Sequence, residues 1–174
     1  PFAPSLYTRV LTNRFETARY TSLEVSDRMA FDRGRTVVTI GLRADEVALV
    51  VDDLKPGAPI PLSRDRTLQL SYHAGVNYQL VRNRALLCAI ISTAFDPATP
   101  VDARTGRIQQ NETTLGYESG LKGCTVGGRL DYSASAFLLS NRNIARRNPL
   151  YDDPVFDKNQ TQPQLVASGE ERFA

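Results

Sequence analysis

A two-residue repeat of polar and apolar side chains is the feature that most constrains the fold of this chain. Between residues 71 and 80, the odd positions are polar or small and the even positions are Tyr72, Ala74, Val76, Tyr78 and Leu80. Successive side chains of a β-strand point to opposite faces, whereas a helix would scatter these residues around its circumference. The segment is therefore predicted to be a strand with one apolar face and one polar face.

The same alternation predicts strands at residues 22–31, 36–45, 113–122 and 130–138. Two segments differ: residues 84–95 are apolar or small on both faces, and residues 161–171 form a weak strand at best, because they contain Pro163. With six strands, perhaps seven, the chain is predicted to be an all-β antiparallel up-and-down meander. If the sheet is continuous, Leu115, Tyr117 and Leu121 share a face with the apolar row of residues 72–80.

Short and long connections alternate along the chain. The short turns are residues 32–35, 81–83 and 123–128, and the long, polar, proline-bearing connections are residues 47–66, 96–112 and 142–160. This asymmetry is typical of an outer-membrane barrel, with short periplasmic turns and long extracellular loops. Alternation alone fits a soluble antiparallel sandwich or calyx that binds a small ligand or protein partner equally well. A truncated product without function is a third interpretation.

Composition narrows the class of protein further. The 21 basic and 19 acidic residues give a net charge of +2, which argues against a dedicated nucleic-acid binder. The longest charge-free, mostly apolar stretch, residues 85–95, is shorter than the roughly 20 residues of a membrane helix. The chain begins at Pro1 with neither an initiator Met nor a signal peptide, so we expect a mature chain or, preferably, a piece of a longer one.

No residue pattern indicates an enzyme. The single histidine, His73, falls on the polar face of its strand, and no nucleophile elbow, P-loop or dinucleotide fingerprint is present. Cys88 and Cys124 do not form a metal-binding pair, and a disulfide between them stays open. The aspartate and glutamate pairs at or in the long connections are read as solvated rather than as calcium ligands. We predict no catalytic, cofactor-binding or metal residues and no cofactor, and the sequence leaves the substrate-binding residues unknown.

Several segments, in order, resemble TonB-dependent outer-membrane receptors of the ferric-siderophore type. The most specific is Gly116-Tyr117-Glu118-Ser119-Gly120-Leu121-Lys122-Gly123, which resembles the family's "YExGxK" strand. The other matching segments are Gly41-Leu42-Arg43-Ala44-Asp45, Ser71-Tyr72-His73-Ala74-Gly75-Val76-Asn77-Tyr78, Ser92-Thr93-Ala94-Phe95-Asp96-Pro97, Thr105-Gly106-Arg107, Gly128-Arg129-Leu130, Phe137 and Asn143-Ile144. The family usually has a proline–glutamate pair where this chain has Gln110-Asn111-Glu112-Thr113.

The resemblance implies a sector from the C-terminal part of a plugged barrel of about 22 strands. It further implies a bacterial outer-membrane location, TonB-dependent uptake of a ferric siderophore, and contacts with the TonB energy-coupling system and outer-membrane lipid. Residues 1–174 are then a single region, a partial barrel of about six to seven strands, and no segment resembles the plug domain or the TonB-box.

Two groups of charged residues follow from this interpretation. Polar-face charges are expected to face the barrel lumen; they are Glu24, Arg28, Arg43, Asp45, Glu118 and Lys122. Loop cations are expected to be solvated, or to attract an anionic ferric chelate; they are Arg104, Arg107, Arg146 and Arg147.

Overall fold

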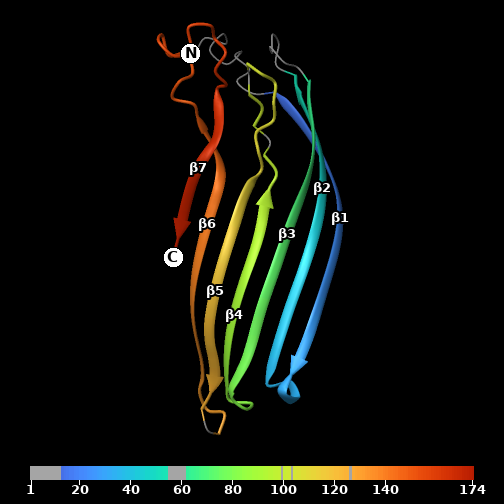
Figure 1. The fold of residues 1–174 in the computed structure, drawn as a ribbon, viewed down its shortest axis with the longest axis vertical. Helices are drawn as coiled ribbons and strands as arrows, with labels where there is room; N and C mark the ends of the chain where they lie inside the picture. Colours follow the sequence, from blue (N-terminus) through green and yellow to red (C-terminus); the bar gives the residue numbers. More distant parts are fainter. Residues whose placement is uncertain (1–12, 55–61, 99, 103, 126) are drawn as a thin grey trace, which may run out of the picture.

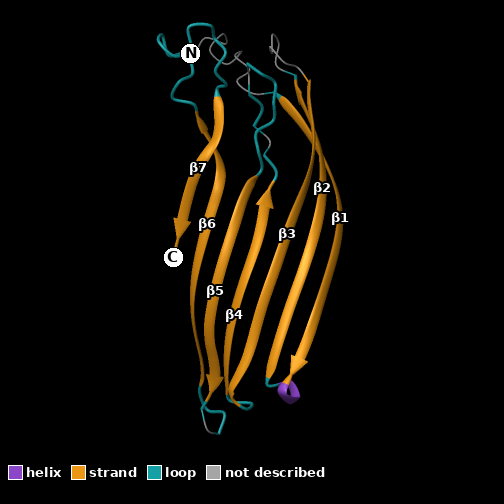
Figure 2. Cartoon of the chain, in the orientation of Figure 1, coloured by secondary structure: helices purple, strands orange, loops and turns teal. Residues whose placement is uncertain are grey.

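One antiparallel sheet contains most of the part of the chain that the structure describes. The computed structural model describes residues 13–54, 62–98, 100–102, 104–125 and 127–174. The strands are β1 (Arg14–Phe31), β2 (Thr36–Asp53), β3 (Leu62–Val81), β4 (Ala85–Asp96), β5 (Glu112–Cys124), β6 (Asp131–Arg147) and β7 (Leu165–Phe173). Each strand pairs antiparallel with the next in sequence, in the order β1 to β7 (Figures 1 and 2). The predicted meander is confirmed, with seven strands.

The connections are asymmetric, as predicted. The three short turns lie together at one end of the sheet, and the β4–β5 and β6–β7 connections lie at the other end, where β2 ends and β3 begins (Figure 1). The first short turn is the 3-10 turn η2 (Asp32–Gly34), and the third contains Gly127 and Gly128, both with positive φ. Glycine adopts this left-handed backbone without steric cost, so these two residues allow the chain to reverse between β5 and β6.

The strands are longer than predicted at the end that carries the long connections. The prediction of a long loop over residues 47–66 is wrong, because β2 continues to Asp53 and β3 already begins at Leu62. Val47, Leu49 and Val51 form the buried core here, at 2–4% exposed, and β-branched residues favour a strand. β6 likewise continues to Arg147, and β7 begins only after Pro163, at Leu165.

The register defines two faces of the sheet. Tyr72 pairs with Leu42, and Ala74 pairs with Ile91, which in turn pairs with Tyr117. Paired residues share a face, so the prediction that Leu115, Tyr117 and Leu121 lie on the same side as Tyr72–Tyr78 is confirmed; Leu80 falls within a bulge. We call this the apolar face and the opposite side, which carries His73 and Asn77, the polar face.

Candidate functional site

An exposed band of aliphatic side chains crosses the apolar face. On the first three strands it extends from the row Phe31, Thr36 and Tyr78 to the row Leu23, Ala44 and Leu70. Leu23 is 70% exposed and Leu70 67% exposed. At about 3.3 Å per residue and a tilt of about 40°, this run of strand spans roughly 20–25 Å, close to the ~25 Å apolar band of outer-membrane barrels.

Charged residues mark one edge of this apolar band. Glu46 and Arg66 form an ion pair on the same face, just beyond the row that contains Leu70. On β1, Asp27 interrupts the band, and its carboxylate accepts the backbone N–H of Arg28 at 2.7 Å. The band continues over β4, β5 and β6 through Leu87, Leu121, Tyr117 and Leu138, which are paired in register. A contiguous apolar surface of this extent is far larger than soluble monomers usually expose.

On the polar face, a charge cluster joins β1 to β2. Arg43 donates to both carboxylate oxygens of Asp45, from Nε at 2.9 Å and from a terminal nitrogen to Oδ1 at 2.8 Å. Ser22 also donates to Asp45, whose side chain is 2% exposed. Glu24 lies opposite Arg43 in the register. Arg43 and Asp45 neutralise each other on β2, and both bond to the Ser22 hydroxyl of β1, so the Arg and Asp of the segment 41–45 help to hold two strands together.

The remaining predicted charges follow the same face. Arg28, Glu118 and Lys122 pair in register with polar-face positions of neighbouring strands. His73 also lies on this face, where its ring occupies the space that Gly41 leaves opposite it. Cys88 and Cys124 are free thiols. Within the described ranges, no three His, Cys, Asp or Glu side chains are grouped as metal ligands would be.

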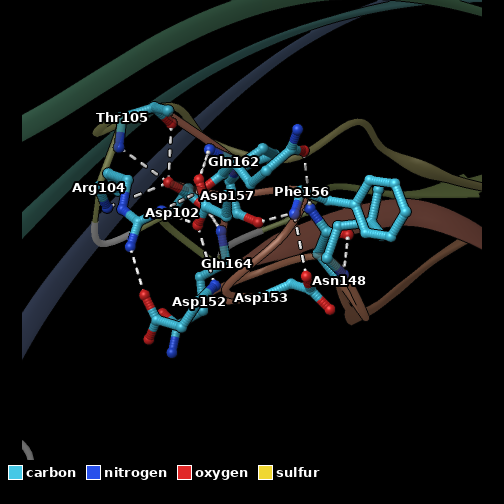
Figure 3. Close-up of polar contacts among 12 residues, drawn as sticks. Asp102, Arg104, Thr105, Asn148, Asp152, Asp153, Phe156, Asp157, Gln162 and Gln164 are labelled. Carbon is cyan, nitrogen blue, oxygen red and sulfur yellow. Dashed lines mark hydrogen bonds and ion pairs between the residues drawn. The ribbon is translucent and has the colours of Figure 1, made fainter. Parts of the chain in front are cut away.

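At the end with the long connections, a buried carboxylate ties two of them together. Asp102, in the β4–β5 connection, is 0% exposed. Its Oδ1 accepts the backbone N–H groups of Arg104 and Thr105 at 3.1 and 2.8 Å, and the Thr105 hydroxyl at 2.9 Å. Its Oδ2 accepts the N–H groups of Gln164, in the β6–β7 connection, and of Leu165, the first residue of β7 (Figure 3). One side chain therefore organises its own turn and anchors the approach to β7.

Arg104 completes this junction, which we call the loop latch (Asp102, Arg104, Asp152 and Asp157). Its guanidinium donates to Asp157 at 2.5 Å, to Asp152 at 2.7 Å and to the carbonyl of Gln162 at 2.9 Å (Figure 3). It also stacks over the Tyr151 ring, 4.3 Å from the centroid. Arg104 is thus already neutralised by two carboxylates, which leaves it unsuited to capture an anionic ligand.

The loop latch perturbs the acidity of its carboxyls. Burial raises the pKa of Asp157, but the Gln162 N–H and the Arg104 guanidinium lower it more, to about 2. For Asp102, burial also raises the pKa, and the hydrogen bonds from Thr105, Leu165 and Arg104 outweigh it, so the pKa is lowered. Both groups are therefore ionised at neutral pH.

Sequence reasoning did not identify the loop latch. The sequence predicts the β4–β5 connection over residues 96–112, and it indicates for Arg104 only a solvated or anion-attracting cation. The local sequence does contain a turn signal at Asp102. An aspartate side chain commonly accepts the backbone N–H groups of the residues two and three positions later, which here are Arg104 and Thr105. The partners of Asp102 and Arg104 in the β6–β7 connection are about 50–60 residues away in sequence, and no local pattern reveals them.

A solved structure with the same fold is that of the alcaligin outer-membrane receptor FauA from Bordetella pertussis. The TM-score is 0.68 and the sequence identity 23%, over 93% of this chain and 27% of the receptor chain. The chain thus spans about a quarter of that receptor's length. No protein-family model and no curated protein sequence matches this chain. In the described part of the chain, no helix is long and apolar enough to cross a membrane. The chain has the fold of an antiparallel sector of an outer-membrane receptor's barrel.

Proposed function

We propose that residues 1–174 form a single region, part of the barrel wall of a TonB-dependent outer-membrane receptor that takes up a ferric siderophore. The apolar band carries this proposal, because it is exposed, lies beside charged residues at one edge, and has a height close to the ~25 Å apolar band of outer-membrane barrels. The similarity to FauA over most of the chain supports it. The partners of the parent protein are then the ferric siderophore, the TonB energy-coupling system and outer-membrane lipid, and its activity is transport rather than catalysis.

A soluble sandwich is the alternative that this surface disfavours. A sandwich buries its apolar faces between two packed sheets. The described strands form one sheet in a single order, and Leu42 on the apolar face is 68% exposed. Lipid covers such a face without a second layer of protein, which is why the membrane setting accounts for it better.

Cell fractionation combined with transport measurements tests the proposal. We expect the protein in the outer-membrane fraction, released by detergent but not by salt, because apolar contact with lipid is insensitive to ionic strength. Deletion of its gene should slow the uptake of radioiron supplied as a ferric siderophore in iron-poor medium. Recovery of the protein in the soluble fraction, together with unchanged uptake of every chelate offered, would contradict it.

A further inference from the structure

Three arginines lie together on the apolar face, beyond the edge of the apolar band that is nearer the long connections. Arg19 on β1 pairs with Ala48 on β2, and Ala48 pairs with Arg66 on β3. Arg64 lies two residues from Arg66 on the same strand, so its side chain is on the same face. Because cross-strand partners share a face, the three arginines flank the small side chain of Ala48. We call Arg19, Arg64 and Arg66 the arginine cluster.

The spacing of the arginine cluster suits a single anionic group. Neighbouring strands lie about 4.8 Å apart, so two strand spacings put the Cα atoms of Arg19 and Arg66 roughly 10 Å apart. The Cα atoms of Arg64 and Arg66 are two strand residues apart, which is roughly 6.6 Å. All three side chains are exposed, and Ala48 between them has only a methyl group. Guanidinium groups that extend over Ala48 can therefore bind one phosphate from several sides, and arginine favours such bidentate contacts.

The positive charge of the arginine cluster is only partly compensated. Arg66 forms an ion pair with Glu46. Among the described residues, no carboxylate lies within ion-pair distance of Arg19 or Arg64. Asp52 is on the same face, one row farther from the apolar band than Arg64, and is not joined to it. Cations this close repel one another, so an anion between them would stabilise the cluster.

Exposed leucines border the arginine cluster on the side of the apolar band. Leu68 lies two residues from Arg66 on β3 and is 68% exposed, and Leu70 follows at the edge of the band, 67% exposed. At a strand tilt of about 40°, two residues span roughly 5 Å along the membrane normal. The headgroup layer of a bilayer is roughly 5–8 Å thick on each side. In the proposed barrel, the cluster therefore lies at headgroup level when the leucines contact acyl chains.

We propose that the arginine cluster binds the phosphate of an anionic lipid whose acyl chains lie on these leucines. Such a lipid matches both parts of the surface, because its phosphate oxygens accept guanidinium hydrogen bonds and its hydrocarbon covers the apolar side chains. A free phosphate would use the arginines and leave the leucines uncovered. The inference rests on the membrane location in the proposed function, not on transport, and it adds a lipid site of defined headgroup chemistry.

Lipid binding by the purified full protein tests this site. The protein in nonionic detergent is titrated with diphosphoryl lipid A, or with the same lipid after both phosphates have been removed. Native mass spectrometry of each titration gives a dissociation constant for each lipid. A third titration adds inorganic phosphate as a competitor, which distinguishes a lipid site from a site for a free anion.

Paired variants separate the arginine cluster from general positive charge. The double variant Arg19→Gln with Arg64→Gln removes the two cations that lack a carboxylate partner. The matched control, Arg28→Gln with Arg129→Gln, removes two exposed cations near the short turns, at the opposite end of the sheet. Both double variants change the net charge by the same amount, so only the position of the lost charge differs.

A single variant of Glu46 gives the opposite expectation. Glu46→Gln removes the carboxylate that neutralises Arg66, and so frees this guanidinium for the phosphate. It should therefore bind the phosphorylated lipid more tightly than the unmodified protein does. A gain of affinity is not produced by misfolding, which keeps the test decisive even if an arginine variant folds poorly.

The phosphorylated lipid should bind the unmodified protein more than about 25-fold more tightly than the dephosphorylated lipid. Each cation at an anionic lipid surface contributes about fivefold, so Arg19→Gln with Arg64→Gln should lose roughly 25-fold for the phosphorylated lipid alone. The control double variant should keep the affinity of the unmodified protein, and inorganic phosphate at the lipid's concentration should not displace it.

Equal affinity for the two lipids, or equal losses in the two double variants, would overturn the lipid site. Displacement of the lipid by an equal concentration of inorganic phosphate would overturn the lipid assignment in favour of a free anion. Cell fractionation separates this outcome from the proposed function. A protein that stays in the outer membrane and supports uptake, but has no preference for the phosphorylated lipid, loses the site alone. A protein found in the soluble fraction would overturn both.

Discussion

Glycines in the sheet differ in the space their neighbours leave, which gives a direct test of packing. A Cβ on Gly123 would fall well inside contact distance of the Arg84 carbonyl oxygen, and 2.7 Å from the Tyr132 hydroxyl. On Gly75 the nearest atom, the Ala89 carbonyl oxygen, would be 3.5 Å away, an ordinary contact. Gly123→Ala should therefore destabilise the chain in lipid vesicles by about 1–3 kcal/mol in urea unfolding. Gly75→Ala, the matched control, should be neutral or slightly stabilising; equal effects of the two variants would contradict this packing.

Asp157 gives a pH-dependent prediction for the loop latch. Its pKa falls from 3.8 to about 2 in the folded chain, so the latch is stabilised fully above pH 3.8 and loses that stability as pH falls toward 2. NMR titration of the Asp157 carboxyl carbon in micelles should give a midpoint near 2, and Arg104→Gln should move it upward. Asp152→Asn, at the exposed side of the latch, should move it less. An unshifted midpoint in the unmodified chain would show that the latch does not form.

In the proposed barrel, each strand separates lipid-facing from lumen-facing positions, so neighbouring residues should respond oppositely to the same change. Val76 lies on the apolar face and Asn77 on the polar face of β3. Val76→Arg places a cation in the apolar band and should cost about 2–4 kcal/mol of stability in a bilayer if the position is near the midplane. Asn77→Arg should cost little, because its side chain meets water. Urea unfolding of both variants in the same vesicles measures the difference, and a larger cost at Asn77 would mean that the faces are exchanged.

The strands that the sequence predicted correctly are those with one apolar face and one polar face. There the alternation is strong, as in residues 36–45 and 71–80, and it predicts both the strand and its orientation. Beyond Asp45, apolar residues also lie on the opposite face, at Val47, Leu49 and Val51, and charged residues enter the outward face at Glu46 and Asp52. Because apolar residues appear on the opposite face here and prolines lie nearby, the sequence resembles that of a loop, although the strand continues.

The loop latch could not be predicted because its parts come from distant segments. Asp102 and Gln164 meet only because the meander brings two connections to one end of the sheet. The order of the strands and the face on which each side chain lies were predictable, because the alternation of polar and apolar residues is a property of each strand. Which loop side chains meet depends on the path of each connection. The loop sequences lack the regular alternation of the strands, so that path cannot be predicted from them.

At the scale of the whole molecule, the two outer strands decide how the chain behaves alone. Among the described strands, β1 pairs only with β2 and β7 only with β6, so each leaves an edge of backbone donors and acceptors. Strand number, tilt and diameter are linked in a barrel, and about 22 strands set a curvature that seven cannot close. Open edges recruit other strands, and the apolar band recruits lipid or other chains.

We therefore expect the isolated chain to aggregate in plain buffer and to keep its strand content in detergent micelles. Pairing of β1 with β7 would close a small barrel and remove the open edges that drive aggregation. The interior of a barrel of about eight strands is filled by side chains, however, so the polar face would become buried. Arg43 is neutralised by Asp45, whereas Lys122 lies opposite Leu86 and Glu118 opposite Ile90, so closure would bury charges beside apolar partners. Sedimentation velocity without detergent should show a broad distribution of large species, and micelles should restore a single one. A sharp monomer boundary with cooperative unfolding in buffer would reject the barrel-sector proposal and favour a soluble β-module.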